Sequence, residues 1–178
     1  MRKVVAGGFV SLDGVAEAPD RFFTQWDDVV DARIPAATGT QDAVILGRRS
    51  YDEWAQFWPT SDIEPFATFI NGVTKYVATS TPLDAPWANS TAIDGELVEF
   101  VRNLKEQPGR DIGVHASISV AQSLLAADLV DELWLIVAPC IVGEGRRLFE
   151  GVPSVQLEPT RGEVTPSGYL IADYRVVR

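Results

Sequence analysis

The sequence predicts an α/β fold whose sheet is mostly parallel and ends in an antiparallel hairpin. Three observations favour this architecture: apolar strand-like runs alternate with helical periodicity, several of the runs are continuously apolar, and the C-terminal part holds two strand candidates around a turn. Alternation of this kind is typical of βαβ units, whose strands are buried on both faces. We expect one domain over residues 1–178, because ~100–200 residues is the usual domain size.

The first half of the chain is expected to contain three strands and two helices. β-Branched or continuously apolar runs predict strands at residues 4–10, 43–46 and 75–79. An apolar stripe at helical spacing predicts a first helix over residues 22–34. A second helix is expected to open at Arg48, directly after the strand that Gly47 closes.

The second half repeats the alternation more clearly. Asp94 is a candidate cap for a helix in which Leu97, Val101 and Leu104 recur at i, i+4 and i+7. Ser117 is a candidate cap for a second helix. Strands are expected at residues 112–115 and 132–138, and a hairpin is expected from residues 155–163 and 169–177.

The charge balance excludes some classes of partner. Fifteen basic and 25 acidic residues give a net charge of −10, and both nucleic acids and anionic membranes attract basic surfaces instead. We therefore expect no nucleic-acid and no membrane partner, although one small phosphate-bearing ligand needs only a few local positive groups. A single cysteine excludes an intrachain disulfide framework and a Cys-based zinc site, and no other cluster of metal ligands is evident. With no signal peptide and no long apolar run, we expect a cytoplasmic protein.

Three strand-to-helix junctions carry residues suited to a phosphate group. In open α/β sheets, ligands bind beyond the carboxyl ends of the strands, often on helix N-termini. The candidates are Gly47, Arg48, Arg49 and Ser50 at the first junction, Ser80 and Thr81 at the second, and His115, Ala116, Ser117 and Ile118 at the third. A second basic pair, Arg146-Arg147, lies beside another strand end. The alternative explanation of Arg48-Arg49 is a solvated helix start, because basic pairs are common.

Several motifs occur together in an order that resembles a known superfamily. They are Ser11-Leu12-Asp13-Gly14, Leu46-Gly47-Arg48-Arg49-Ser50-Tyr51, Lys75-Tyr76-Val77-Ala78-Thr79-Ser80, Leu129-Val130-Asp131-Glu132-Leu133, Pro139 and Gly143-Glu144-Gly145. This set is similar to the dihydrofolate reductase superfamily. It most resembles the reductase domains of the bifunctional riboflavin-biosynthesis deaminase-reductases and their single-domain relatives. The similarity covers nearly the whole chain.

The resemblance implies a dihydrofolate-reductase-like three-layer α/β/α fold, NADPH as cofactor and a homodimer. The implied activity is reduction of a small heterocycle, of pterin or ribosylamino-pyrimidine type, such as 5-amino-6-(5-phosphoribosylamino)uracil. By motif, the junction at residues 47–50 would hold the cofactor's phosphates, Ser80 and Thr81 would lie near the 2′-phosphate, and residues 115–118 would meet the pyrophosphate. The family usually has glycine where this chain has Ala116, and a methyl group there limits backbone approach.

The resemblance also bears on the substrate. Leu12 and Asp13 resemble part of the mobile loop that covers the nicotinamide, and Asp13 is the candidate catalytic acid, because reduction of a C=N or C=O bond needs a proton as well as a hydride. Trp26 and Asp27 could stack and pair with a pterin or pyrimidine ring. The alternatives are that the aromatic residues are core, that Asp27 and Asp31 are solvated, that Asp13 is a plain turn residue, and that His115 is a satisfied histidine at a strand end.

A second function class stays open at this point. Fold does not determine function, so a non-catalytic ligand-binding or oligomer-forming descendant of the same fold is the alternative. The alanine at position 116 motivates it.

Overall fold

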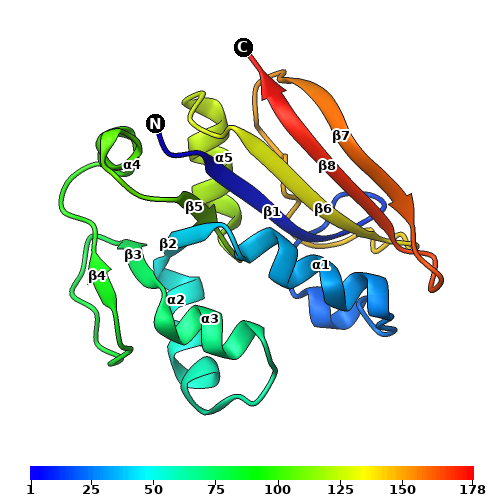
Figure 1. Ribbon diagram of the computed structural model, residues 1–178, viewed down its shortest axis with the longest axis horizontal. Coiled ribbons are helices and arrows are strands. Elements are labelled where there is room, and N and C mark those ends of the chain that lie inside the picture. Colours follow the sequence, from blue (N-terminus) through cyan, green and yellow to red (C-terminus); the bar gives the residue numbers. More distant parts are fainter.

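One eight-stranded sheet organises the computed structural model, which describes residues 1–178 (Figure 1). The strands lie in the order β4-β3-β2-β5-β1-β6-β8-β7. Their bounds are β1 Val4–Ser11, β2 Gln41–Gly47, β3 Thr74–Ala78, β4 Ser90–Ala92, β5 Asp111–Val114, β6 Glu132–Ala138, β7 Gln156–Val164 and β8 Leu170–Val177. The strands from β4 to β6 in this order pair in parallel, while β8 is antiparallel to β6 and to β7. The mostly parallel sheet with an antiparallel C-terminal hairpin is confirmed.

Helices cover both faces of this sheet. They are α1 Asp28–Thr38, α2 Arg48–Phe57, α3 Phe66–Gly72, α4 Leu97–Glu106 and α5 Ile118–Ala126, with short 3₁₀ turns η1 Pro19–Arg21 and η2 Trp58–Thr60. In Figure 1, α4 and α5 lie above the sheet, and α1, α2 and α3 lie below it. The predicted three-layer arrangement is therefore confirmed. None of these helices has the length and apolar character needed to span a bilayer.

The hydrophobic core is divided by the sheet. On the α4 and α5 face, one continuous cluster joins residues of β1, β2 and β5 to both helices, with Leu124 of α5 fully buried. The opposite face carries two separate clusters. One packs Val30 of α1 against Ile136 and Ile171, and the other packs Tyr51 of α2 and Ile70 of α3 against β2 and β3. This division matters because residues of all three clusters contribute to the lining of the candidate site.

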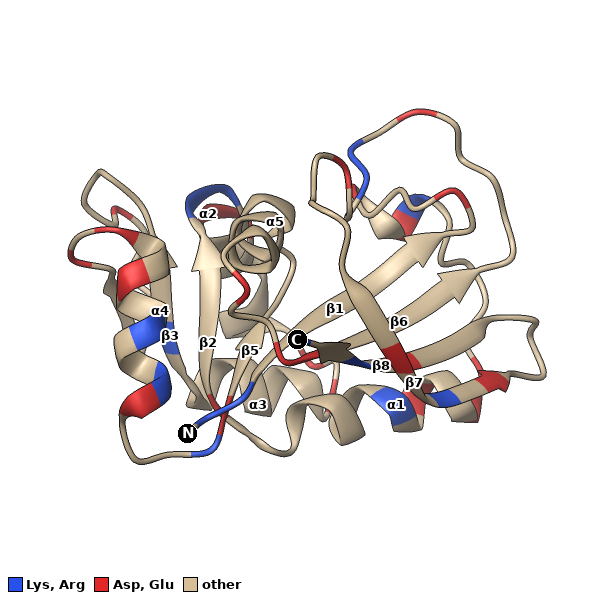
Figure 2. Ribbon diagram, turned by 90° about the horizontal axis from the view of Figure 1, so that it is seen from above, with Lys and Arg blue, Asp and Glu red and all other residues tan.

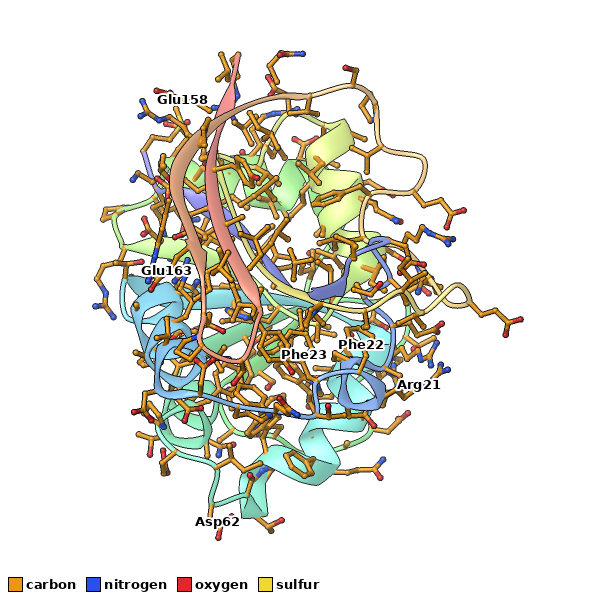
Figure 3. All side chains as sticks on the ribbon, turned by 90° about the vertical axis from the view of Figure 1, so that its right-hand side faces the viewer. Arg21, Phe22, Phe23, Asp62, Glu158 and Glu163 are labelled. Atoms are coloured by element: carbon orange, nitrogen blue, oxygen red, sulfur yellow. The ribbon has the colours of Figure 1, made fainter.

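The first helix begins later than predicted. Residues 22–34 were expected to be helical, but α1 starts only at Asp28. Asp27 is the reason, because its extended backbone ends the preceding segment and its carboxylate accepts hydrogen bonds from the N–H groups of Val29 and Val30. Phe23 belongs to a non-helical segment, and Figure 3 shows it near the middle of the molecule while Arg21 lies at the rim.

The two predicted caps in the second half do not act as expected. Helix α4 begins at Leu97 with Glu96 in the capping position and no side-chain cap, so the prediction for Asp94 is wrong. Ser117 does occupy the capping position of α5, but its hydroxyl accepts a hydrogen bond from another junction instead of from its own helix. By contrast, β6 coincides with the strand predicted over residues 132–138.

Candidate active site

A cleft of about 1090 Å³ opens at the carboxyl ends of β2 and β5 and runs along β1. Its lining comes from β1 and β6, from the segment before α1, from α2, η2, α3 and α5, from the junctions that follow β2 and β5, and from the loop after β6. We call the side chains of Arg48, Arg49 and Arg146 its arginine rim. We call Phe9, Trp58, Phe66, His115 and Trp134 its aromatic floor. All eight residues line the cleft.

The junctions after β2 and β5 are bonded to each other beside the arginine rim. The Gly47 N–H donates to Ser117 Oγ over 2.7 Å, and Ser50 Oγ donates to the Ala116 carbonyl over 3.0 Å. Neither α2 nor α5 has a side-chain cap, so N–H groups of both first turns lack side-chain acceptors. Figure 2 shows the basic residues at the start of α2 close to α5. Two helix starts with positive dipole ends therefore converge on one place, which favours an anion.

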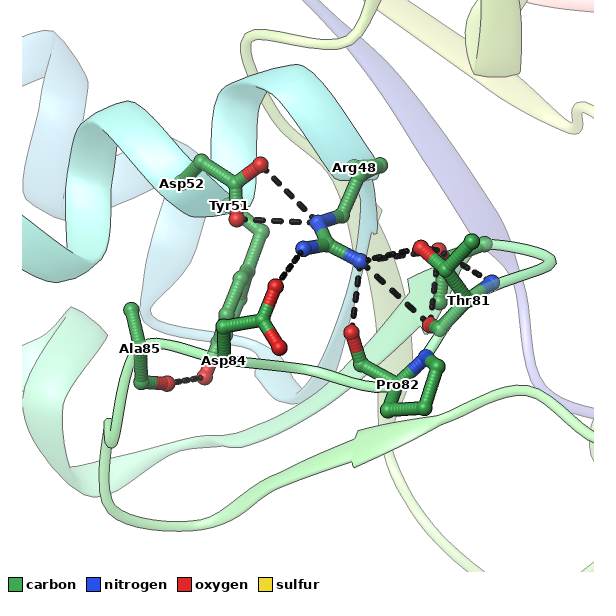
Figure 4. A network of polar contacts seen from close by, with 8 residues as sticks. Arg48, Tyr51, Asp52, Thr81, Pro82, Asp84 and Ala85 are labelled. Atoms are coloured by element: carbon green, nitrogen blue, oxygen red, sulfur yellow. Dashed lines mark hydrogen bonds and ion pairs between the residues drawn. The ribbon is translucent and has the colours of Figure 1, made fainter.

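Arg48 is held in a dense network of its own (Figure 4). Its Nε lies 2.9 Å from both carboxylate oxygens of Asp52, its Nη2 donates to Asp84 over 2.9 Å, and its Nη1 donates to Thr81 Oγ1 over 2.5 Å. These contacts, with the Asp52 hydrogen bond foremost, raise the pKa of Arg48. The side chain thus fixes the loop after β3 to α2. Ser80 and Thr81 themselves do not line the cleft, and their proposed contact with a 2′-phosphate stays a prediction.

Arg49 and Arg146 lie closer to solvent and share a partner. The Arg49 side chain is 72% exposed, with its Nη1 3.5 Å from Glu17 and its Nε 3.1 Å from Glu53. The backbone N–H of Arg146 donates to Glu17, and its guanidinium donates to Ser119 Oγ over 2.7 Å. Exposed ion pairs of this kind contribute little and exchange readily. Both guanidinium groups can therefore turn toward a ligand beside the start of α5.

Ala116 takes the backbone conformation for which glycine is usual. Its φ of 53° lies in the left-handed region, which an L-residue with a Cβ adopts only at a cost of about 1 kcal/mol. The chain thus keeps the turn between β5 and α5 despite the methyl group, and the methyl group adds strain there. Ala116, Ser117 and Ile118 all line the cleft, as do Gly47 and Ser50.

Asp13 lies outside the lining of the cleft. Its carboxylate accepts hydrogen bonds from Ser11 Oγ and from the backbone N–H groups of Val142 and Gly143, and it lies 3.6 Å from the Arg147 guanidinium. The Ser11 hydrogen bond, followed by the two backbone donors, holds the pKa of Asp13 well below its ordinary value. The carboxylate therefore fastens the loop after β1 to the loop after β6. Its catalytic role stays a prediction.

Asp27 is likewise engaged in structure and does not line the cleft. Besides capping α1, it accepts the backbone N–H of Ser167. Burial alone would raise the pKa of Asp27, but hydrogen bonds from Thr165 and from the backbone outweigh it and hold the pKa below its ordinary value. Trp26 does line the cleft, whereas Leu12 is exposed and lies outside it. Of the three predicted substrate residues, the structure places only Trp26 at the cleft.

His115 lies at the centre of the aromatic floor. It is 5% exposed, and its Nε2 lies 2.7 Å from Gln41 Oε1. A side chain at Gly113 would collide with this pair, since a Cβ there would lie 2.0 Å from Gln41 Oε1. Burial lowers the pKa of His115 to about 4, so the ring is neutral at pH 7.

Sequence reasoning missed the glycine pair inside β1. Gly7 and Gly8 have φ of 150° and 147°, and a Cβ on Gly7 would lie 1.8 Å from the Trp134 carbonyl oxygen. A Cβ on Gly8 would meet open space, and both glycines line the cleft. Paired glycines within a β-branched strand could have indicated that β1 lines a cleft, because glycine in a strand marks close approach of a ligand or of another backbone.

Comparison with known proteins finds both sequence relatives and solved structures of the same fold. An uncharacterised protein, YyaP, from Bacillus subtilis (strain 168) is 26% identical, over 83% of this chain and 80% of its own length. A protein from Shewanella sp. PV-4, provisionally assigned to riboflavin biosynthesis, superposes with a TM-score of 0.80 at 19% identity and covers 99% of both chains. A diaminohydroxyphosphoribosylaminopyrimidine deaminase/5-amino-6-(5-phosphoribosylamino)uracil reductase from Thermotoga maritima gives a TM-score of 0.69 at 17% identity. That match covers 99% of this chain and 57% of the other.

The structural matches establish the fold, and the family follows from the sequence. The family model described as the RibD C-terminal domain matches residues 2–171, which is nearly the full length of the chain. The protein therefore belongs to the RibD C-terminal domain family.

Proposed function

We propose that the protein is an NADPH-dependent reductase of a small heterocycle. One observation carries this proposal. The same cleft contains two helix starts without side-chain caps, the arginine rim beside them, and the aromatic floor. The rim suits the phosphates of a dinucleotide, and the floor suits flat rings. Family membership supports the same reaction class.

The residues present fit the cofactor. The guanidinium groups of Arg49 and Arg146 and the first-turn N–H groups of α5 would hold its phosphates. Gly8 leaves open space above β1, where a flat ring can approach the backbone. When bound there, NADPH would supply a hydride to a C=N or C=O carbon of the substrate.

In this proposal the proton for the reduction comes from water and not from Asp13, the acid expected from the sequence. Asp13 is ionised at neutral pH because its pKa is lowered, and His115 is neutral with a pKa of about 4. Neither group holds a transferable proton at pH 7. In this proposal, water entering the open cleft protonates the substrate heteroatom, while the aromatic floor orients the ring.

Titration of the purified protein with NADPH tests the proposal. We expect saturable binding and, with a suitable pterin or aminopyrimidine, oxidation of the bound NADPH. Failure to bind at millimolar cofactor would exclude the reductase. Binding without turnover on any of these heterocycles would favour the alternative, a non-catalytic ligand-binding descendant of the fold. The homodimer implied by family resemblance is part of the proposal, and light scattering coupled to gel filtration tests it.

A further inference from the structure

The side chain of Gln41, the first residue of β2, crosses Gly113 to reach His115, which directly follows β5. Gln41 is 2% exposed, and its Nε2 donates a hydrogen bond to the Ala37 carbonyl over 2.9 Å. This bond turns the amide oxygen Oε1 toward His115 Nε2, which lies 2.7 Å away. Because an amide oxygen only accepts, His115 Nε2 carries the hydrogen. The buried ring is neutral, with a pKa of about 4, so its other nitrogen, Nδ1, carries a lone pair.

Neighbouring groups also fix the orientation of the imidazole ring of His115. Its centroid lies 6.0 Å from that of Phe66 and 6.5 Å from that of Trp134, so aromatic side chains pack around it. A Cβ on Gly113 would lie 2.7 Å from Nε2, so the strand passes close to the ring. A half-turn about the Cβ–Cγ bond would exchange Nε2 for a carbon atom and break the hydrogen bond to Gln41. The chain thus holds one tautomer in one orientation.

The Nδ1 atom of His115 has no partner within the chain, but it remains accessible. The only side-chain polar atoms that are both inaccessible and without a hydrogen bond are the indole nitrogens of Trp58 and Trp134. Nδ1 makes no hydrogen bond and is not one of these atoms, so part of its surface is open, and His115 lines the cleft. The cleft therefore contains a lone pair, set among aromatic rings, that no group of the protein serves. Such a polar atom in apolar surroundings favours a ligand that pairs with it.

We propose that Nδ1 of His115 accepts a hydrogen bond from an amide or amine N–H of the bound ligand, and that Gln41 is the positioning residue that holds the imidazole in this tautomer. A ligand carbonyl at the same place would face the lone pair and be disfavoured. The inference rests on the proposed function, under which the nicotinamide carboxamide is the expected donor. His115 directly precedes the turn into α5, whose first N–H groups would hold the cofactor's phosphates. An amino group of the heterocycle is the other source of the same donor.

Nuclear magnetic resonance tests the role of Gln41 without any ligand. The chain has one histidine, so ¹⁵N-labelled histidine gives signals from His115 alone, and two-bond ¹H–¹⁵N correlations identify its tautomer. We expect only the Nε2–H tautomer in the parent at pH 7 and a detectable Nδ1–H fraction in Gln41→Leu. Thr38→Val is the matched control, because the buried Thr38 hydroxyl donates only to Ile34 of its own helix, and it should keep the parent pattern. An Nδ1–H tautomer in the parent, or the parent pattern in Gln41→Leu, would overturn the positioning role.

A pair of dinucleotides tests the acceptor. NADP⁺ and its acetylpyridine analogue differ only in the carboxamide, whose NH₂ group is a methyl group in the analogue. By isothermal titration calorimetry, we expect the parent to bind NADP⁺ about fivefold more tightly, the effect of one hydrogen bond. His115→Phe, which keeps a flat ring without the acceptor, should bind both with the same Kd. NADP⁺ should also shift the Nδ1 resonance of the parent, and the analogue should not. This shift and the parent's two Kd values decide the result even if His115→Phe does not fold.

Pterin alone tests the other source of the donor, since it carries an amino group and no dinucleotide. An Nδ1 shift with pterin and none with NADP⁺ would place the donor on the heterocycle and support the acceptor role. An Nδ1 resonance that saturating NADP⁺ and pterin both leave unmoved would overturn the inference.

The outcomes separate this inference from the proposed function. Saturable NADP⁺ binding with an Nδ1 resonance that responds to neither ligand would reject the acceptor and leave the reductase standing. Absence of NADP⁺ binding with a response to pterin would do the reverse. Absence of binding by both ligands would overturn both proposals.

Discussion

The arginine rim and the aromatic floor of the cleft handle charge in opposite ways. At the rim, the Arg49 guanidinium is solvated and already paired with the carboxylates of Glu17 and Glu53. Such pairs can exchange a carboxylate for a ligand phosphate at little cost. On the floor, His115 is buried and neutral and no base is present. Under the proposed function, this contrast would let an acidic protein bind an anion at one end of the cleft and disfavour it at the other.

The rim itself contains a second contrast. Arg48 and Arg49 are adjacent in the sequence, yet the Arg48 side chain is 25% exposed and the Arg49 side chain is 72% exposed. Arg48 points into the loop that follows β3, and its donors are occupied (Figure 4). Arg49 is instead paired with Glu17 of the loop after β1, whose carboxylate also accepts the Arg146 backbone N–H. We therefore assign a structural function to the first arginine and a ligand-binding function to the second.

We expect acidification to have the largest effect on stability, and it acts through His115 in the aromatic floor. The pKa of His115 falls from 6.5 in the unfolded chain to about 4 in the folded protein. Between these values only the unfolded chain binds the proton, so stability falls as the pH falls. We expect the free energy of unfolding of the parent to drop by up to about 3 kcal/mol more than that of His115→Gln between pH 7 and pH 4. Urea denaturation at each pH measures this difference, and parallel pH profiles would contradict a buried neutral histidine.

Removal of Arg48 should cost stability. Arg48→Ala leaves Asp52 and Asp84 without their shared partner and frees the loop after β3, so we expect a loss of about 1–2 kcal/mol in the free energy of unfolding. Arg102→Ala is the control, because Arg102 is an exposed arginine of α4 without an ion pair, and it should change little. Thermal and urea denaturation measure both. Equal stability of the two variants would remove the structural function assigned to Arg48.

Arg49 should affect binding more than stability. We expect Arg49→Ala to weaken NADPH binding about tenfold, the loss of one charge-assisted hydrogen bond, while the free energy of unfolding stays within about 0.5 kcal/mol of the parent. Arg49→Lys, which keeps the charge, should recover part of the affinity. If Arg48→Ala and Arg49→Ala both bind NADPH like the parent, the phosphates do not lie at this junction.

The smallest effect is expected at the turn that joins rim and floor. Ala116→Gly removes the Cβ from a residue with positive φ, and we expect the free energy of unfolding to rise by roughly 0.5–1 kcal/mol with no loss of NADPH affinity. Ala32→Gly, at an exposed position within the right-handed helix α1, should instead lower it. A destabilised Ala116→Gly protein would show that the methyl group contributes more by packing than it costs in strain.

The strands were predicted better than the helix starts. The apolar run at residues 132–138 gives β6 without error, because a strand buried on both faces must be apolar throughout. The helix predicted over residues 22–34 begins six residues late, since periodicity could not show that Phe22, Phe23 and Trp26 precede the Asp27 cap. The stripe that suggested a helix is instead an aromatic segment packed beside the cleft, with Phe23 and Phe9 centroids 4.5 Å apart.

From the sequence, the candidate site could be predicted only at the junctions where a strand is followed by a helix. Gly47, Ser50 and Ser117 could be placed at the cleft because they follow strands whose carboxyl ends share one edge of the sheet. Trp58, Phe66 and Trp134 could not, because in the sequence a cleft-lining aromatic looks the same as a core aromatic. Asp13 and Asp27 lie outside the cleft lining and instead accept hydrogen bonds from backbone N–H groups distant in the sequence.

The sequence by itself determined the α/β class, the parallel strands, the hairpin and the basic junctions, since hydrophobic periodicity and turn chemistry are local properties. Only the tertiary structure decided which of two adjacent arginines has its donors occupied and which stays exposed. It alone also decided that two indole N–H groups stay unpaired and that the sole histidine is neutral. These features depend on contacts between residues distant in sequence, such as Gln41 with His115 and Arg48 with Asp84. Burial sets the charge of a titratable group, and burial exists only once those contacts have formed.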